Sequence, residues 1–459
     1  MFVKKVDNIS GEEIFKCRFV ARRDLQKSHD VKQLYSPVVG IEVTRVFLAL
    51  AAHYECNVKQ CDISTAFLYG ELENEVYLSL PTALKQKYGN EYCWVTKRSI
   101  YGLHEAPKAW HHTMKRFLEG YGFKCCPVEE SLFMYDFDGV KVFLILYVDD
   151  ILYFGTNDQK IKHFEEALSK RFAVKYKHTA EKFVGVEIVQ SEKSITIGQK
   201  KYVEDLVKTF ELTDAKELKT PMEAMMVPTN DGQKLENVTL YQSMIGALLY
   251  LNQCTRPDLS FVINQLSRFN KNPSLTNLKM AKRVIKYLKQ AKNKRIEYKK
   301  DDQGLVVDAF VDAEFGKHAD GRSVFGYVIN LNGAPILFKT KSQKTVSLSS
   351  TESEFIAMSE ASKKIMWLKN IFAFLNEKVE RWTMWNDNQS AIKIAKSGMS
   401  CNRTKHIKLR YFHIRELIEN GEFEVKYVSG DENVADLFTK SLGRNKFEYF
   451  VKKLFGSNN

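Results

Sequence analysis

With 459 residues, the chain exceeds what one hydrophobic core usually serves, and its length predicts two or more domains. Its 69 Lys and Arg outnumber its 56 Asp and Glu, and the resulting charge of +13 favours a polyanionic partner such as nucleic acid. No apolar run approaches the ~18 residues that cross a bilayer, and no N-terminal signal peptide is present. We therefore expect a soluble protein without a membrane partner.

The first part of the chain predicts short strands that alternate with helices. Strands are expected at residues 2–5 and 16–21, joined by a turn at 7–11, and amphipathic helices at 43–53 and 108–121. The eight cysteines are scattered without a C-x-x-C pair, which argues against a zinc site and a disulfide framework. They favour reduced thiols in a cytosolic or nuclear compartment.

The most apolar run of the chain, residues 142–146, leads into Tyr147, Val148, Asp149 and Asp150. This pattern predicts a buried strand that turns tightly and lifts two carboxylates into a cleft. Adjacent carboxylates supply the oxygen ligands that divalent cations need. Alone, the pattern is more often an ordinary acidic turn. A second short strand with one acid, Asp62, strengthens the interpretation as a metal site.

Beyond residue 155 the periodicity is mainly helical. Helices are expected at residues 160–172, 202–210, 241–254, 258–269 and 277–291, strands at 184–189 and 194–197, and a loop at 220–236. A charged stretch at 292–302 predicts a domain boundary. It is followed by strands at 306–311, 326–331 and 335–338, a helix at 350–375, and alternating elements that suit an α/β fold.

Many motifs, all in one order, resemble the copia-type LTR retrotransposon polyproteins. The reverse transcriptase motifs are KCRFVAR at 16–22, QCDISTAFLYGEL at 60–72, SIYGLHEAPKAW at 99–110, LYVDDI at 146–151, FVGVEI at 183–188, TPM at 220–222 and YQSMIGALLYLNQCTRPDLSFVINQLSRF at 241–269. The ribonuclease H motifs are VDAEF at 311–315, SLSSTESEFIAM at 347–358, DNQSAI at 387–392, RTKHI at 403–407 and NVADLFTKSL at 433–442. The resemblance covers nearly the whole chain.

The resemblance implies a multidomain α+β and α/β fold, a right-hand polymerase with fingers, palm and thumb followed by a ribonuclease H-like domain. The expected divisions are 1–155 for fingers and palm, 156–300 for the end of the palm and a helical thumb or connection, 301–445 for ribonuclease H, and 446–459 for a C-terminal tail. The fingers are expected to be N-terminally truncated, because the family carries several tens of residues upstream of the basic strand.

In the polymerase half, the resemblance implies that Asp62, Asp149 and Asp150 form the catalytic metal triad, with Asp150 tuning the site. Phe67 would be the aromatic gate against a ribose 2′-hydroxyl, although packing in the core is the alternative. Arg18 would contact the triphosphate, because a guanidinium matches phosphate oxygens, although a surface strand with solubilising charge is the alternative. Tyr101 and Gly102 would line the nucleotide pocket, where glycine permits close backbone approach.

In the nuclease half, the resemblance implies that Asp312, Glu354, Asp387 and Asp436 are the catalytic, metal-binding acids. Only one of Glu352 and Glu354 can face the site, because two positions rotate a helix by about 200°. Glu354 is the residue that matches the family.

Five residues need separate comment. Arg23 stands where the family has glycine, which questions the local turn, and Glu314 and Phe315 replace the family's usual Asp and Trp. His406 is either structural or assists phosphate positioning or proton transfer. His413 is expected to be structural.

The implied function is an RNA-directed DNA polymerase with ribonuclease H activity, which copies RNA into DNA and degrades the RNA strand of RNA–DNA hybrids. Its cofactors would be two Mg²⁺ per active site, with Mn²⁺ as an alternative. Its partners would be RNA template, DNA primer and product, hybrid, dNTPs and other polyprotein products in a cytoplasmic virus-like particle, or in the nucleus. The alternative is a nucleic-acid-binding remnant with little or no catalytic activity.

Overall fold

The computed structural model describes residues 2–6, 13–17, 19–26, 35–229, 231–316, 321–397 and 405–456. They fold into two compact units, and the chain passes between them three times. The first unit comprises Met1–Gly40 and Val58–Thr179, and the second comprises Ile41–Asn57 and Ala180–Asn459. Ile41–Asn57, which precede Asp62 in the sequence, thus belong to the unit that holds the C-terminal half of the chain.

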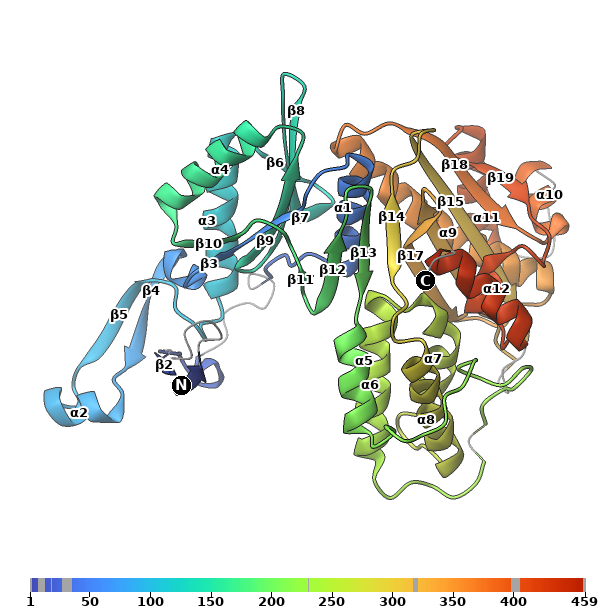
Figure 1. The fold of residues 1–459 in the computed structure, drawn as a ribbon, viewed down its shortest axis with the longest axis horizontal. Helices are drawn as coiled ribbons and strands as arrows, with labels where there is room; N and C mark the ends of the chain where they lie inside the picture. Colours follow the sequence, from blue (N-terminus) through green and yellow to red (C-terminus); the bar gives the residue numbers. More distant parts are fainter. Residues whose placement is uncertain are drawn as a thin grey trace. The chain divides into compact units, whose positions relative to one another are not determined.

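The first unit is organised around a six-stranded antiparallel sheet. Its strands, in spatial order, are β10 (Val174–Lys177), β3 (Lys59–Ile63), β9 (Asp150–Gly155), β8 (Val140–Tyr147), β7 (Glu129–Phe137) and β6 (Lys124–Cys126). Helices α3 (Ala106–Tyr121) and α4 (Asp158–Arg171) cover one face (Figure 1). Their apolar residues, such as Met114 and Phe164, pack on alternate residues of the central strands, so the remaining strand residues point to the other face.

Two hairpins extend the first unit. They are β1 (Phe2–Val6) with β2 (Glu13–Cys17), and β4 (Glu71–Ser79) with β5 (Cys93–Arg98), and the second carries α2 (Thr82–Tyr88) at its tip (Figure 1). The predicted strand at 16–21 is therefore wrong in its extent, since regular pairing ends at Cys17. Beyond it, Ala21 N–H donates to the carbonyl of Tyr101 at 2.8 Å instead of to a neighbouring strand. The expected turn at 7–11 lies outside the described residues.

The N-terminal part of the second unit is a four-stranded sheet with helices. The strands, in spatial order, are β11 (Lys182–Phe183), β12 (Val186–Gln190), β13 (Ser194–Gly198) and β14 (Ile296–Lys299). The helices are α1 (Ile41–His53), α5 (Lys200–Thr209), α6 (Val238–Cys254), α7 (Ser260–Ser267) and α8 (Leu275–Gln290). Helix α1, blue in Figure 1, packs on β13 and β14 and also on β17 of the next sheet.

The remaining strands of the second unit form a mixed five-stranded sheet. In spatial order they are β17 (Ala334–Ser342), β16 (Val324–Leu331), β15 (Leu305–Glu314), β18 (Val379–Asn386) and β19 (Glu424–Tyr427). The first three pair antiparallel and the last three pair parallel. Helix α9 (Ser350–Phe374) packs on β15 and β16, and α10 (Gln389–Ser397) and α11 (Lys405–Glu419) pack on α9. This is the predicted succession of strands followed by alternating strands and helices.

Two expected boundaries differ from the structure. The first unit continues past residue 155 to Thr179, because β10 pairs with β3. At residues 292–302 the chain does leave one sheet for the next, but this stretch also contains β14, which pairs with β13. The buried residues Ile296 and Tyr298 of β14 alternate with charged residues. The strand was therefore not recognised in this charged stretch of the sequence.

The expected C-terminal tail is instead a packed helix, α12 (Arg444–Phe455). Its apolar residues recur at helical spacing and are buried, namely Phe447, Phe450, Val451, Leu454 and Phe455. Among the described residues, no helix is both long and apolar enough to span a bilayer.

Candidate active sites

The first candidate site is the turn between β8 and β9. Tyr147 pairs with Asp150, so only Val148 and Asp149 form the turn. Val148 has φ of 56°, which is strained for a β-branched residue. The buried Trp110 of α3 donates from Nε1 to the Val148 carbonyl at 2.6 Å and so anchors this turn.

Asp62 and Asp150 lie side by side on the sheet. They are cross-strand partners of β3 and β9, so their side chains project from the same face, opposite the one that packs on α3 and α4. Ile63 N–H donates to the Asp149 carbonyl at 2.9 Å, which fixes β3 against the turn. Burial raises the pKa of Asp150, with a further contribution from Asp62.

Gln60 also belongs to this site, although the sequence analysis did not single it out. Its side chain is buried, and Nε2 donates to Oδ1 of Asp150 at 3.0 Å. The available signal was its position two residues before Asp62, which places both side chains on one face of β3. Gln60 therefore holds the Asp150 carboxylate in place.

The expected nucleotide-binding residues are only partly described. Phe67 and Tyr101 make an edge-to-face contact with ring centroids 5.0 Å apart. Arg18 lies outside the described residues, so its expected contact with the triphosphate stays a prediction.

Gly102 lies against the backbone of Ala21 in the structure. Gly102 has φ of 92°, and a Cβ there would lie 2.1 Å from the carbonyl oxygen of Ala21. The absence of a Cβ thus permits close approach of the backbone at Ala21, and the expected contact with a nucleotide stays a prediction. Arg23, which departs from the family pattern, donates from Nε to Nδ1 of His104 at 2.9 Å. Both contacts tie residues 21–23 to the segment after Ser99.

The second candidate site gathers Asp312, Glu354 and Asp387. Asp312 lies on the central strand β15, Glu354 on α9, and Asp387 directly after β18. One carboxylate oxygen from each lies within 4.8 Å of the other two. The parallel register that pairs Phe310 with Trp385 places Asp312 and Asp387 at the same end of neighbouring strands.

The two sites differ in how closely their acids approach. Among the described residues, Asp62, Asp149 and Asp150 do not form a group of ligand atoms that all lie within 4.8 Å of one another. The structure thus brings Asp312, Glu354 and Asp387 together and pairs Asp62 with Asp150 across strands.

Neighbouring side chains hold the second cluster. Of the two candidate glutamates on α9, Glu354 faces the cluster, whereas Glu352 accepts from Leu348 N–H at 2.8 Å and serves the start of the helix. Asn386 donates from Nδ2 to Oε2 of Glu354 at 3.0 Å and to the Val311 carbonyl. This amide fixes the glutamate relative to strand β15.

Asp436 lies beside the cluster through lysine contacts. It sits in the 3₁₀ helix η5 (Val434–Phe438), capped by Asn433. Lys440 Nζ contacts Oδ1 of Asp436 and lies 3.1 Å from Oδ1 of Asp312. Lys446 Nζ lies 2.9 Å from Oδ2 of Asp436. Lys440 was not predicted as a site residue, although it stands four residues after Asp436 in the quoted motif.

Burial and neighbouring charges shift the pKa values of the acids and of Lys440 in this site. Burial raises the pKa of Asp312 to about 6, against the opposing effect of Lys440. Burial and Asp312 raise the pKa of Glu354 well above its usual range, and burial raises that of Asp387. Burial lowers the pKa of Lys440, but Asp312 and Asp436 outweigh it and the net shift is upward.

The donor set of this cluster fits a divalent cation. All ligand atoms are carboxylate oxygens, which Mg²⁺ prefers, and the three acids lie close together in a buried or half-buried place. Asp312, Glu354 and Asp387 would hold the ion.

The histidines give less information. The side chain of His406 lies outside the described residues, so its proposed role stays a prediction. His413 is half-buried on α11.

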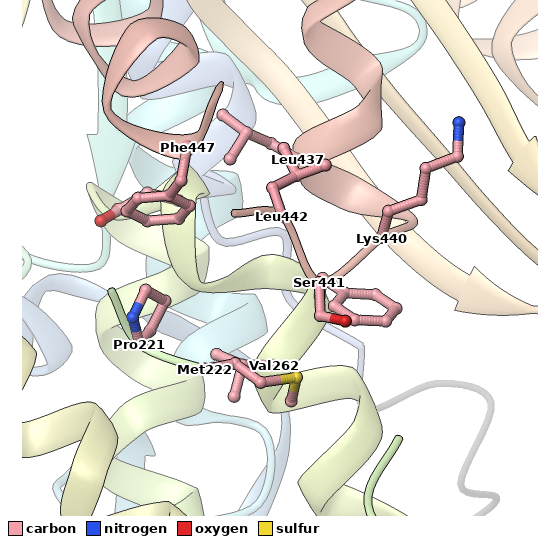
Figure 2. A pocket seen from close by; sticks show the side chains of 10 residues that line it. Pro221, Met222, Val262, Leu437, Lys440, Ser441, Leu442 and Phe447 are labelled. Atoms are coloured by element: carbon pink, nitrogen blue, oxygen red, sulfur yellow. The ribbon is translucent and has the colours of Figure 1, made fainter. Parts of the chain in front are cut away.

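An apolar pocket lies next to Lys440 in the second unit. Figure 2 shows Pro221, Met222, Leu437, Leu442 and Phe447 around it, while the Lys440 side chain extends away from them. Of the lining residues, Lys440 is the one that contacts the buried acids Asp312 and Asp436.

Comparisons with known proteins match both halves of the chain. Residues 1–224 match the family model described as Reverse transcriptase (RNA-dependent DNA polymerase). The chain is 32% identical to the retrovirus-related Pol polyprotein from transposon TNT 1-94 of Nicotiana tabacum, over 96% of this chain and 34% of that protein. It is 32% identical to the corresponding polyprotein from transposon RE2 of Arabidopsis thaliana, over 99% of this chain and 31% of that protein.

The chain thus spans about a third of the length of these curated relatives. Among solved structures, LC11-RNase H1, isolated from compost, is 12% identical and has a TM-score of 0.24, covering 29% of this chain and 92% of that chain.

Proposed function

The chain belongs to the copia-type retrotransposon Pol polyproteins, and we propose that it joins an RNA-directed DNA polymerase to a ribonuclease H. The observation that carries the proposal is that each compact unit gathers carboxylates at the ends of buried strands. Phosphoryl transfer needs this chemistry, since its barrier falls mainly through positioned positive charge.

In the polymerase unit, Asp62 and Asp149 would hold the divalent cations and Asp150, fixed by Gln60, would support them. In the nuclease unit, Asp312, Glu354 and Asp387 would hold the cations, with Asp436 as the fourth acid. When bound, Mg²⁺ activates the attacking oxygen and neutralises charge on the leaving group. The anchored turn at Val148 and the amide of Asn386 keep the carboxylates positioned for this role.

The proposed substrates are primed RNA or DNA with dNTPs, and RNA–DNA hybrid. The net charge of +13 supports polyanionic substrates. We also propose that the protein works with other polyprotein products in a cytoplasmic virus-like particle or in the nucleus, where the scattered cysteines would stay reduced.

Asp387→Asn tests the two-site proposal. We expect it to lower cleavage of the RNA strand of a labelled hybrid by at least about a hundredfold, because it removes one metal ligand charge while preserving volume. Incorporation of dNTPs on primed RNA should change less than about twofold, since Asp62 and Asp149 belong to the other unit.

Asp302→Asn is the matched control for this test, because Asp302 is exposed on the turn before β15. Equal loss of cleavage and polymerisation in Asp387→Asn would contradict two independent sites. Full cleavage by Asp387→Asn would contradict the nuclease assignment itself.

Phe67→Ala tests the proposed gate. The ring packs against Tyr101, and its removal should let a ribose 2′-hydroxyl enter, so we expect the ratio of rNTP to dNTP incorporation to rise by at least about tenfold. The neighbouring Leu68→Ala, at a residue whose side chain is 41% exposed, should leave the ratio unchanged. An active Phe67→Ala enzyme with an unaltered ratio would assign Phe67 to core packing alone.

A further inference from the structure

Lys440 occupies a position among the nuclease acids that an ordinary surface lysine does not. Its ammonium lies between Asp312, a member of the close triad, and Asp436, which lies outside the triad. The side chains of both acids are almost fully buried, at 1% and 4% exposure, whereas that of Lys440 is 30% exposed. The partly exposed Lys440 side chain therefore places its positive charge next to the buried carboxylate of Asp312.

The oxygens of Asp312 are already occupied. Oδ1 pairs with Lys440 at 3.1 Å, and Oδ2 accepts from the Thr439 hydroxyl. The oxygens of Asp436 are occupied too, since Oδ1 pairs with Lys440 and Oδ2 lies 2.9 Å from Lys446. A cation bound to Oδ1 of both Asp312 and Asp436 would meet the Lys440 ammonium, which contacts both of these oxygens.

Competition follows from charge as well as from space. A lysine and a divalent cation both satisfy these buried carboxylates, and two positive groups at contact distance repel strongly in a partly buried site. Because Lys440 is attached to the chain four residues after Asp436, its local concentration is high and does not depend on the metal concentration.

We propose that Lys440 is a built-in counter-ion that competes with a divalent cation for Asp312 and Asp436. The ion shared by these two acids then binds weakly, while the ion held by Asp312, Glu354 and Asp387 binds tightly. Lys440 thereby sets the cation concentration at which the nuclease site is filled. This inference rests on the proposed nuclease function.

The experiment compares Mn²⁺ binding to the whole chain and to two lysine variants by isothermal titration calorimetry. An Asp312→Asn chain identifies which binding steps belong to the nuclease site. In Lys440→Met, we expect the half-saturating concentration of the weaker Asp312-dependent step to fall by about tenfold or more, because a contacting positive charge is removed. Lys446→Met is the matched control, since Lys446 contacts Asp436 without contacting Asp312, and its shift should be clearly smaller.

A measurement on the unaltered chain keeps the test independent of variant folding. When the cation displaces Lys440, its amine becomes more accessible, so acetylation of Lys440 followed by mass spectrometry should increase with Mn²⁺ at the concentration that fills the weaker step. Lys440→Arg, which keeps the charge, should retain the weak step.

The outcomes separate the two proposals. Two Asp312-dependent steps in the unaltered chain, with the same midpoints in Lys440→Met and no change in Lys440 acetylation, would overturn the competition and leave the nuclease proposal standing. Absence of any Asp312-dependent Mn²⁺ binding in the unaltered chain would overturn both.

Discussion

Asp149→Asn is expected to abolish DNA synthesis while the chain still binds primer–template. Metal-assisted charge stabilisation is worth several kcal/mol, and each 1.4 kcal/mol corresponds to about tenfold in rate, so the loss should reach at least about a thousandfold. The substitution preserves volume, and the backbone contact from Ile63 N–H to the Asp149 carbonyl does not involve the side chain. Incorporation of dNTPs on primed RNA and retention of labelled primer–template on a filter measure the two properties.

The same strand provides a matched control for this prediction. Asp138 is exposed in the two-residue turn at the other end of β8, where Asp138 and Gly139 both have positive φ. Asn is well suited to this turn, so Asp138→Asn should retain full synthesis. Joint loss of synthesis and binding in Asp149→Asn would show instead that Asp149 supports the fold. Retained hybrid cleavage would confirm that the second unit is intact.

Asp312, Glu354 and Asp387 were predicted from the order of the family motifs, because each acid alone resembles an ordinary surface or capping group. Asp312 and Asp387 lie at the ends of alternating apolar strands, and Glu354 follows a helix start that Ser349 caps. Their proximity comes from the parallel register of β15 and β18, which the sequence pattern does not encode. The predicted helices agree with α1, α3, α4, α5, α6, α8 and α9 to within a few residues, because their apolar spacing is regular.

The partners of these elements could not be predicted, and Arg45 illustrates why. It stands within an apolar helix, where the sequence favours a solvent-facing arginine, yet its side chain is buried. Its guanidinium donates to the Gln253 and Cys254 carbonyls at 2.6 and 3.0 Å, which are terminal carbonyls of α6, and to Ile336 at 2.6 Å. These partners are about 200 and 290 residues away in sequence, so no local pattern specifies them.

Gln60 and Lys440 were not predicted as site residues, for a related reason. Each is a polar residue of common type whose role depends on one contact, with Asp150 or with Asp312, across the fold. The motif that contains Thr255, Arg256 and Asp258 was used only as evidence of family. The structure adds a structural role for it in the core of the second unit.

Asp258→Asn is expected to destabilise the second unit by about 3–5 kcal/mol. Arg256 donates from Nε and Nη2 to the two oxygens of Asp258 at 2.9 and 2.6 Å, and both side chains are at most 2% exposed. Tyr287 donates its hydroxyl to the same carboxylate at 2.6 Å, and Arg256 Nη1 donates to the Ala291 carbonyl at the end of α8. Removing the negative charge leaves the buried guanidinium without a counter-charge. Removal of one partner of a buried ion pair lowers the free energy of unfolding by about this amount.

The measurement must report on the second unit alone, because a chain of two units need not unfold in one transition. Hydrogen exchange resolved on peptides of α7 and α8 meets this need, and Asp214→Asn, at an exposed position, is the matched control. The double replacement Arg256→Met and Asp258→Leu should lower the stability of the second unit less than Asp258→Asn does, because it removes both buried charges. It leaves chiefly the Tyr287 hydroxyl without its acceptor, which costs about 1–3 kcal/mol. If Asp258→Asn exchanged like the control, the pair would contribute nothing to stability, and retention of this motif would need a functional explanation instead.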